Sequence, residues 1–162
     1  MRLLLTGSTG WLGRHLAPRL AALGHEVTGL DVAPGPHTQV TGSVADRALI
    51  DQIFGNHGIE AVIHAGALHK PDIARFPARA FIDTNVTGTL NLLEAAGAAG
   101  HDRFVMTSTT SLMISQAVRD EVSEEAVWMD ETYAPLAPRN IYGVTKLAAE
   151  SLCRQVHGET GL

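Results

Sequence analysis

The sequence of 162 residues predicts an α/β fold in which a parallel sheet is covered by helices on both faces. Short runs rich in Val, Ile and Leu alternate with longer amphipathic stretches, which is the order expected of βαβ units. A glycine follows three of the amphipathic stretches, where a left-handed residue commonly ends a helix. These glycines are Gly24, Gly58 and Gly100. The composition, 45% hydrophobic and 18% charged, suits one domain over residues 1–162.

The individual elements follow from the same patterns. Strands are predicted at Arg2 to Thr6, Glu26 to Asp31, Thr38 to Thr41, Ala61 to Ala65 and Arg103 to Ser108. Helices are predicted at Trp11 to Leu23, Asp46 to Asn56, Pro77 to Ala99 and Arg139 to His157. The segment from Ser115 to Pro138 has no clear period, so we interpret it as an active-site loop or a partly disordered stretch.

Charge and composition narrow the class of function. A net charge of -5 and a pI near 5.9 provide no basic surface for nucleic acid or for an anionic membrane. Apolar runs such as Leu3 to Leu5 are too short to span a bilayer, and the glycine-rich start is unlike a secretory signal. We therefore expect a cytoplasmic protein that acts on small molecules. Cys153 has no partner cysteine, and the histidines show no ligand spacing, so neither a disulfide nor a metal site is expected.

A glycine-rich turn joins the first strand to the first helix. Its sequence is Thr6-Gly7-Ser8-Thr9-Gly10-Trp11-Leu12-Gly13, with the spacing Gly-x-x-Gly-x-x-Gly. Backbone N–H groups at a helix amino terminus bind phosphate, and glycines allow a tight turn, close approach of the ligand and close helix packing. A purely structural turn is the alternative. The predicted phosphate-binding residues are Gly7, Thr9, Gly10, Trp11, Leu12 and Gly13.

Asp31 ends the second predicted strand, about twenty residues beyond the turn, where a dinucleotide site places an acidic residue. Its carboxylate would accept hydrogen bonds from the adenosine ribose hydroxyls. The residues that follow, Val32, Ala33 and Pro34, offer no arginine to balance a 2′-phosphate, so the sequence favours NAD over NADP as the cofactor. The alternative is that Asp31 only caps a helix or turn.

The segment Tyr142-Gly143-Val144-Thr145-Lys146 resembles the Tyr-x-x-x-Lys signature of the short-chain dehydrogenase/reductase superfamily. Together with the glycine turn, it is similar to the extended branch, the NAD-dependent epimerase/dehydratase family. Residues four apart share a helix face, so Lys146 would lie beside Tyr142 and its charge would favour the phenolate. The resemblance implies a Rossmann-type doubly wound fold with NAD as cofactor. It also implies that Tyr142 is the catalytic acid/base and that Lys146 binds the nicotinamide ribose.

The same resemblance implies a third catalytic residue, a Ser or Thr just after the fifth strand. Here that strand is followed by a run of hydroxyl side chains. Matching strand to strand selects Thr109, with Ser108 and Thr110 as neighbouring alternatives. Simple capping of the strand end by these hydroxyls is the competing interpretation.

Other stretches resemble cofactor-binding parts of the family. Ala65, Gly66 and Ala67 match the loop that lies along the cofactor, and Ser43 and Val44 match positions beside the adenine. Asn85 matches an asparagine near the active site of relatives, although a hydrogen bond to the backbone inside a helix is an alternative role.

The resemblance also bears on the reaction, which in these relatives begins when NAD takes a hydride from a carbinol carbon. Relatives that are 4,6-dehydratases carry an Asp-Glu pair after the catalytic threonine, whereas this chain has Thr110 and Ser111. Leu112-Met113-Ile114 replaces the Val-Tyr-Gly that is common in sugar-nucleotide epimerases. Epimerase and dehydrogenase therefore both remain as candidate activities. The candidate substrates are a sugar nucleotide or another carbinol or carbonyl compound.

Relatives continue for about as long again, with a sixth strand and a carboxy-terminal substrate domain. We therefore expect this chain to be the amino-terminal portion of such an enzyme, with the substrate domain absent and with little activity on its own. The family also implies a homodimer formed through the helices after Asn85 and around Tyr142. A non-catalytic NAD-binding regulator and an interaction domain are the alternatives from other functional classes.

Overall fold

The computed structural model describes residues 1–120 and 128–162 and contains a five-stranded parallel sheet. The strand order is β3-β2-β1-β4-β5. Because the order reverses at β1, the chain leaves a crevice at the carboxyl ends of β1 and β4, where open α/β sheets bind ligands. The strands are β1 (Arg2–Thr6), β2 (Glu26–Asp31), β3 (Val40–Thr41), β4 (Ala61–His64) and β5 (Phe104–Met106).

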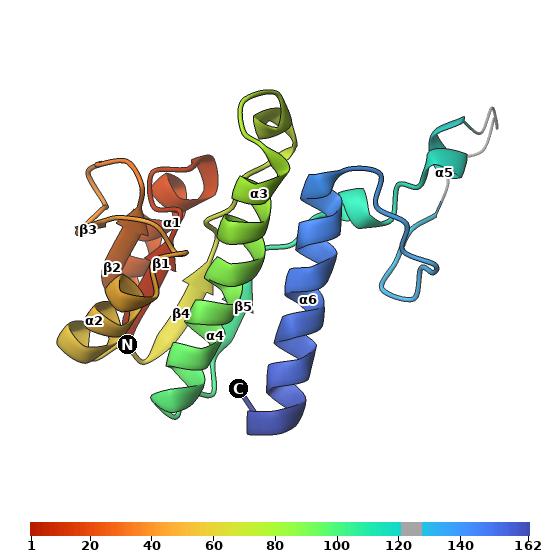
Figure 1. Cartoon of the computed structure of the whole chain (residues 1–162). Coiled ribbons are helices and arrows are strands. Elements are labelled where there is room, and N and C mark those ends of the chain that lie inside the picture. The colour runs from red at the N-terminus through yellow and green to blue at the C-terminus, as the bar shows by residue number, and fades with distance from the viewer. Residues whose placement is uncertain (121–127) are drawn as a thin grey trace.

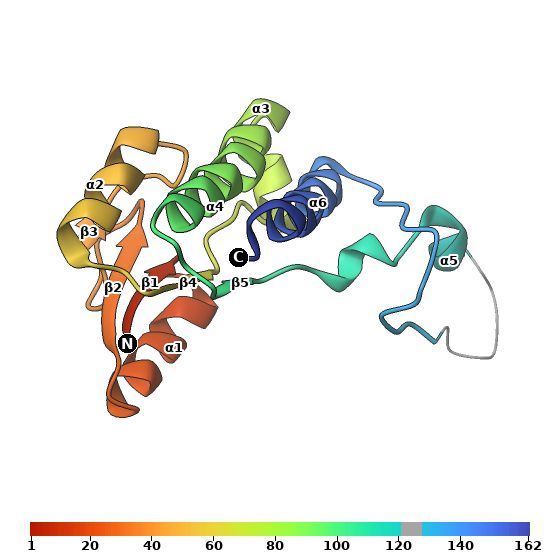
Figure 2. The ribbon, with the colours of Figure 1, turned by 90° about the horizontal axis from the view of Figure 1, so that it is seen from below.

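Helices cover the two faces of the sheet unequally (Figures 1 and 2). The long helices α2, α4 and α6 lie on one face, and α1 lies on the other. The long helices are α1 (Trp11–Ala22), α2 (Arg47–His57), α4 (Gly88–Ala98) and α6 (Ile141–Thr160). The shorter pieces are the 3-10 turns η1 (Lys70–Ala74) and η3 (Thr110–Leu112), the helices α3 (Ala78–Phe81) and α5 (Gln116–Asp120), and the π-helical turn η2 (Ile82–Thr87).

The main core lies between the sheet and the helices α2 and α4. Leu4 and Leu30 from neighbouring strands meet Ile50, Ile53 and Leu92, and all five side chains are almost completely buried. Burial of each such side chain contributes about 1.5–3 kcal/mol relative to exposure. This packing holds the carboxyl ends of β1, β2 and β4 at one edge of the molecule.

Local signals set the ends of the helices. The Asp46 side chain accepts a hydrogen bond from the Leu49 amide at the start of α2, and Asn140 does the same for the Gly143 amide at the start of α6. Gly24, Gly58 and Gly100 have φ angles of 84°, 54° and 71°. The left-handed conformation predicted for these three glycines is therefore confirmed.

Most predicted elements are present, although several bounds differ; for example, the third strand is only Val40–Thr41 rather than Thr38 to Thr41. The predicted helix from Pro77 to Ala99 is divided into α3, η2 and α4, because a π-helical turn interrupts it. The fifth strand ends at Met106 rather than Ser108, since the Thr107 amide makes the last bond, to the His64 carbonyl. The segment expected to lack regular structure contains α5, while its residues 121–127 lie outside the described part of the chain.

Within 1–120 and 128–162, no helix combines the length and the hydropathy needed to cross a bilayer. In the same part of the chain, no group of three or more His, Cys, Asp or Glu side chains is arranged to hold a metal ion.

Candidate active site

The glycine-rich turn fits so closely against its neighbours that side chains are excluded at two positions. Gly7 has a φ of 72°, and a Cβ atom there would lie 2.7 Å from the Gly66 nitrogen. A Cβ atom at Gly13 would lie 2.1 Å from the Gly7 carbonyl oxygen, so α1 packs directly on the turn. The Gly7 amide donates to the Leu30 carbonyl at 2.8 Å, which fixes the turn beside the end of β2.

The first amides of α1 are not capped by a side chain. The residue at the helix start is Gly10, and no acidic residue lies in the first turn. The Trp11 side chain is 73% exposed and packs against His15, with ring centroids 5.4 Å apart. The backbone N–H groups of Trp11 and Leu12 can therefore donate hydrogen bonds to an anion at this helix end.

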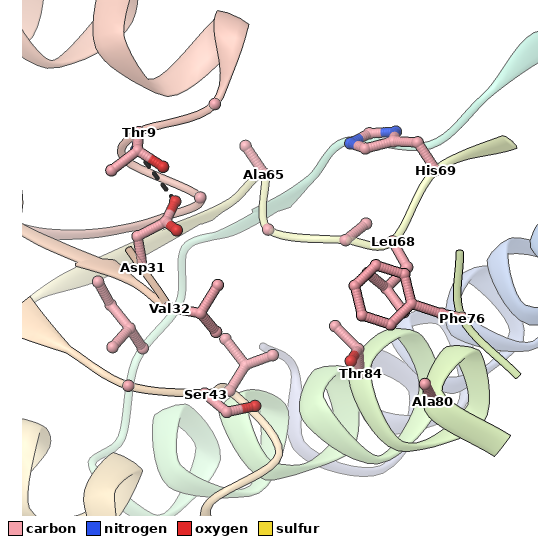
Figure 3. A pocket seen from close by; sticks show the side chains of 17 residues that line it. Thr9, Asp31, Val32, Ser43, Ala65, Leu68, His69, Phe76, Ala80 and Thr84 are labelled. Atoms are coloured by element: carbon pink, nitrogen blue, oxygen red, sulfur yellow. Dashed lines mark hydrogen bonds between the residues drawn. The ribbon is translucent and has the colours of Figure 1, made fainter. Parts of the chain in front are cut away.

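A cavity of about 500 Å³ lies above the carboxyl ends of β1, β2 and β4 (Figure 3). Many of the residues predicted to bind the cofactor line this cavity. The predicted residues that line it are Gly7, Thr9, Gly10, Asp31, Ser43, Val44, Ala65, Gly66 and Ala67. Those that do not line it are Trp11, Leu12, Gly13, Asn85, Tyr142, Lys146 and Thr109.

Several lining residues were missed by the sequence analysis. Phe76, Ala80 and Thr84 form one wall. Ala80 and Thr84 are four residues apart, the spacing of one helix face, whereas Phe76 lies before α3 and carried no such signal. Leu68 and His69 extend the loop after β4 toward this wall, as Figure 3 shows. Leu30, Val32 and Gly42 complete the lining.

Asp31 combines both roles considered for it. One carboxylate oxygen accepts from the Thr9 amide at 3.0 Å, and the other accepts from the Ala33 amide at 3.1 Å. The side chain therefore caps the turn and also lines the cavity. Because each carboxylate oxygen has two acceptor sites, Asp31 keeps lone pairs for ligand hydroxyl groups.

Tyr142 and Lys146 lie one turn apart on α6, and both are nearly buried, with exposed fractions of 7% and 3%. Burial lowers the pKa of Lys146, and the nearby Cys153 and Glu150 partly oppose that shift. Among residues 1–120 and 128–162, no carboxylate lies within ion-pair distance of Lys146. The His69 ring at the cavity wall packs against the Tyr142 ring, with centroids 5.7 Å apart.

The hydroxyl groups after β5 have separate partners. Ser108 Oγ donates to Glu150 on α6 at 2.5 Å. Thr109 Oγ1 accepts from the Ser111 amide at 3.1 Å, so it caps η3 and keeps its own proton available. These contacts occupy Ser108 in holding β5 to α6, and they leave Thr109 and Thr110 as the hydroxyl candidates.

Asn85 does not line the cavity, and its side chain holds two segments together. Its Oδ1 accepts from the Leu68 amide at 2.8 Å, and its Nδ2 donates to the Leu68 carbonyl at 3.0 Å. The same Nδ2 donates to Thr145 Oγ1 on α6 at 3.0 Å. The side chain is thus engaged by the loop after β4 and by the helix of Tyr142.

His64 is fully buried at the end of β4. Burial lowers the pKa of His64 to about 3, with a smaller contribution from the charge of Lys146. Its ring nitrogens contact Thr6 Oγ1 at 2.7 Å and Thr89 Oγ1 at 3.1 Å. The imidazole is therefore neutral at physiological pH.

The family model described as "NAD dependent epimerase/dehydratase family" matches residues 3–162, nearly the whole chain. The chain belongs to this family. The resemblance of the glycine turn and the Tyr-x-x-x-Lys segment to the extended short-chain dehydrogenases/reductases is confirmed, and so is the Rossmann-type fold.

Two curated members of the epimerase/dehydratase family illustrate the similarity. The chain is 33% identical to UDP-glucose 4-epimerase of Rhizobium meliloti (strain 1021), over 99% of this chain and 47% of that protein. It is 40% identical to GDP-6-deoxy-D-mannose reductase of Pseudomonas aeruginosa, over 95% of this chain and 46% of that protein. The chain spans about half the length of these relatives.

Solved structures of the family agree with the fold. A short-chain dehydrogenase/reductase superfamily protein from Agrobacterium tumefaciens, crystallised with NAD, is 33% identical and superposes with a TM-score of 0.79. The match covers 97% of this chain and 45% of that one.

Proposed function

We propose that residues 1–162 form one NAD-binding domain that supplies the acid/base group for hydride transfer at a carbinol carbon of a sugar nucleotide. The observation that carries the proposal is one cavity that brings together a glycine-rich turn, a carboxylate and a loop of small residues, beside a buried Tyr-Lys pair. Relatives named as a UDP-glucose epimerase and a GDP-sugar reductase support the substrate class, and a neighbour crystallised with NAD supports the cofactor.

The residues of the cavity fit the parts of a dinucleotide. The uncapped amides at the start of α1 would bind the pyrophosphate, and a Cβ atom at Gly7 would obstruct the approach of the neighbouring loop. Asp31 would accept from the adenosine ribose, with Ser43 and Val44 beside the adenine. The small side chains of Ala65 and Ala67 would leave room for the rest of the molecule.

The chemistry divides between the cofactor and the protein. NAD, when bound, supplies the acceptor for the hydride. Tyr142 takes the proton of the substrate hydroxyl, and Lys146, one turn further along α6, would bind the nicotinamide ribose. The hydroxyl group of Thr109 donates a hydrogen bond to the substrate oxygen and orients it. Because epimerases and dehydrogenases share this step, the same residues serve either outcome.

The direct test is a calorimetric titration of this chain with NAD and with NADP. We expect NAD to bind with a stoichiometry of about one per chain and more tightly than NADP. Circular dichroism of the same sample serves as the control for folding. A folded chain that binds neither nucleotide would contradict the proposed function.

A further inference from the structure

A chain of buried hydrogen bonds begins at the loop that lines the cofactor cavity. The Gly66 amide donates to Thr6 Oγ1 at 3.0 Å, and Thr6 Oγ1 lies 2.7 Å from Nδ1 of His64. Thr6 and His64 have exposed fractions of 0% and 1%, so neither side chain can exchange its partner for water. These first hydrogen bonds therefore join the loop that lines the cavity to the interior of the sheet.

The second part fixes which nitrogen of His64 carries the proton. Thr89 Oγ1 donates its only proton to the Asn85 carbonyl at 2.7 Å, so it can only accept from Nε2 of His64, 3.1 Å away. A neutral imidazole protonated at Nε2 is an acceptor at Nδ1. Thr6 then donates to that acceptor while its oxygen accepts from Gly66, and every member of the chain is satisfied.

The last part leads to the helix of the acid/base residue. The carbonyl that accepts from Thr89 belongs to the π-helical turn η2, and the side chain of the same Asn85 holds Leu68 and Thr145. Thr145 Oγ1 in turn donates to the Tyr142 carbonyl at 2.9 Å. The hydrogen bonds thus run without a gap from the Gly66 amide to the backbone of Tyr142.

We propose that His64, as its Nε2–H tautomer, and Thr89 are positioning residues that set the distance between the cofactor loop and Tyr142. They do so by holding η2 in the conformation in which Asn85 bridges the Leu68 loop and α6. A buried network in which each donor has one acceptor specifies a single geometry, whereas apolar contacts alone would permit sliding. The inference rests on the proposed function for the role of Tyr142 and for NAD binding along the loop after β4.

The first test measures the tautomer. In the chain labelled with 15N-histidine, long-range 1H–15N correlation spectra distinguish the two neutral forms. We expect His64 to show the Nε2–H form in the parent and in Thr89→Ser. In Thr89→Val the acceptor for Nε2–H is lost, so the proton moves to Nδ1, where Thr6 Oγ1 accepts it. An Nδ1–H form in the parent, or no change in the valine variant, would overturn the proposal.

The second test measures the consequence for the site. We expect Thr89→Val to weaken NAD binding about tenfold and to shift the NMR signals of Tyr142, and Thr89→Ser to restore both. The control is Ile53→Val, a core change in α2 that lowers stability without touching the network. If Thr89→Val and Ile53→Val lost equal NAD affinity, the effect of Thr89 would come only from a loss of overall stability. That result would overturn the proposal.

The two tests separate this inference from the proposed function. If the parent does not bind NAD, the proposed function fails, while the tautomer measurement still decides whether the network exists. If the parent binds NAD but His64 shows the wrong tautomer, only the inference fails.

Discussion

Tyr142 carries a phenolic hydroxyl whose removal leaves the packing of α6 in place. We expect Tyr142→Phe, in a catalytically competent form of the enzyme, to reduce hydride transfer by about 10²-fold or more. NAD affinity should stay within about twofold, because the ring still packs against His69. The measurements are the absorbance of NADH at 340 nm and a calorimetric titration. Tyr133→Phe is the matched control, and turnover in Tyr142→Phe equal to that of this control would remove Tyr142 from the mechanism.

Asp31 is predicted to set the choice between NAD and NADP. The parent should bind NAD at least about tenfold more tightly than NADP, because a 2′-phosphate would face the carboxylate. Asp31→Ala should narrow that ratio. Since the change also removes two hydrogen bonds to backbone amides, Ile53→Val, a core change in α2 at a residue that does not line the cavity, controls for stability. Equal affinities of the parent for both nucleotides would refute this role.

Because His64 is buried as a neutral side chain, we expect the folded protein to lose stability in mild acid. The pKa of its folded form is depressed to about 3, below the ordinary value near 6.5, so the unfolded chain binds a proton that the folded chain refuses. Stability is complete above about pH 6.5 and is lost as the pH falls toward 3. At pH 5 this single group lowers the free energy of unfolding by about 2 kcal/mol.

The measurement is urea unfolding at pH 7.5 and at pH 5 for the parent and for His64→Gln. The loss between the two pH values should be about 2 kcal/mol smaller in the variant, because glutamine does not titrate. Because the other seven histidines are common to both proteins, their contribution cancels in the comparison. The same loss in both proteins would show that His64 takes up its proton while folded.

The close contact between α1 and the glycine turn can be tested by comparing an alanine substitution at Gly13 with one at Gly97. Gly13→Ala would place a Cβ atom 2.1 Å from the Gly7 carbonyl oxygen, so α1 must move, and the amides proposed to bind the pyrophosphate must move with it. We expect NAD binding to be lost and the melting temperature to fall. Gly97→Ala in α4 meets no atom within 4 Å, so it should raise stability by up to about 1 kcal/mol and leave binding unchanged. NAD binding by Gly13→Ala at the parent's affinity would contradict this account.

The sequence predicts the elements that depend on local pattern, and misses features that depend on contacts between distant segments. The apolar runs of β1 and β2 place those strands at the residues observed. The periodicity from Pro77 to Ala99 predicts one helix, and nothing in it reveals the π-helical turn at Ile82–Thr87. Asn85 was predicted near the active site from its resemblance to an asparagine of relatives, and only the folded chain shows that its side chain bridges the loop after β4 and α6.

The candidate site shows the same division. The residues of the glycine turn and Asp31 are recognisable from spacing along the chain, and the cavity brings them together. The wall that contains Phe76 and Thr84 comes from a segment without a motif. The choice among the hydroxyls after β5 stays open in the sequence, because only the folded chain shows that Ser108 is engaged by Glu150.

For the whole molecule, the arrangement of helices bears on the predicted homodimer. The helices α4 and α6 lie side by side on the same face of the sheet (Figures 1 and 2). Val144 on α6 is 47% exposed, and Ile82 in the turn that precedes α4 is 37% exposed. These apolar side chains are available to a second copy of the chain.

We expect the chain to dimerise through this face and Val144→Glu to make it monomeric, because a charge would be buried at the interface. Light scattering coupled to size-exclusion chromatography measures the mass directly. Leu23→Glu is the control, since Leu23 is 75% exposed but lies at the end of α1 on the opposite face. A parent protein that is monomeric at high concentration would contradict the prediction.

The π-helical turn η2 also has a consequence for how this stretch of chain tolerates insertions and deletions. A π turn contains one residue more than an α-helix would use for the same connection. Deleting a single residue between Ile82 and Thr87 would let the backbone continue as a regular helix with its flanking turns in place. The side chains inside the turn would move by one position, which is about 100° around the helix axis. Asn85 would then lose Leu68 and Thr145 together. In this segment the number of residues therefore matters more than the identity of those that face solvent.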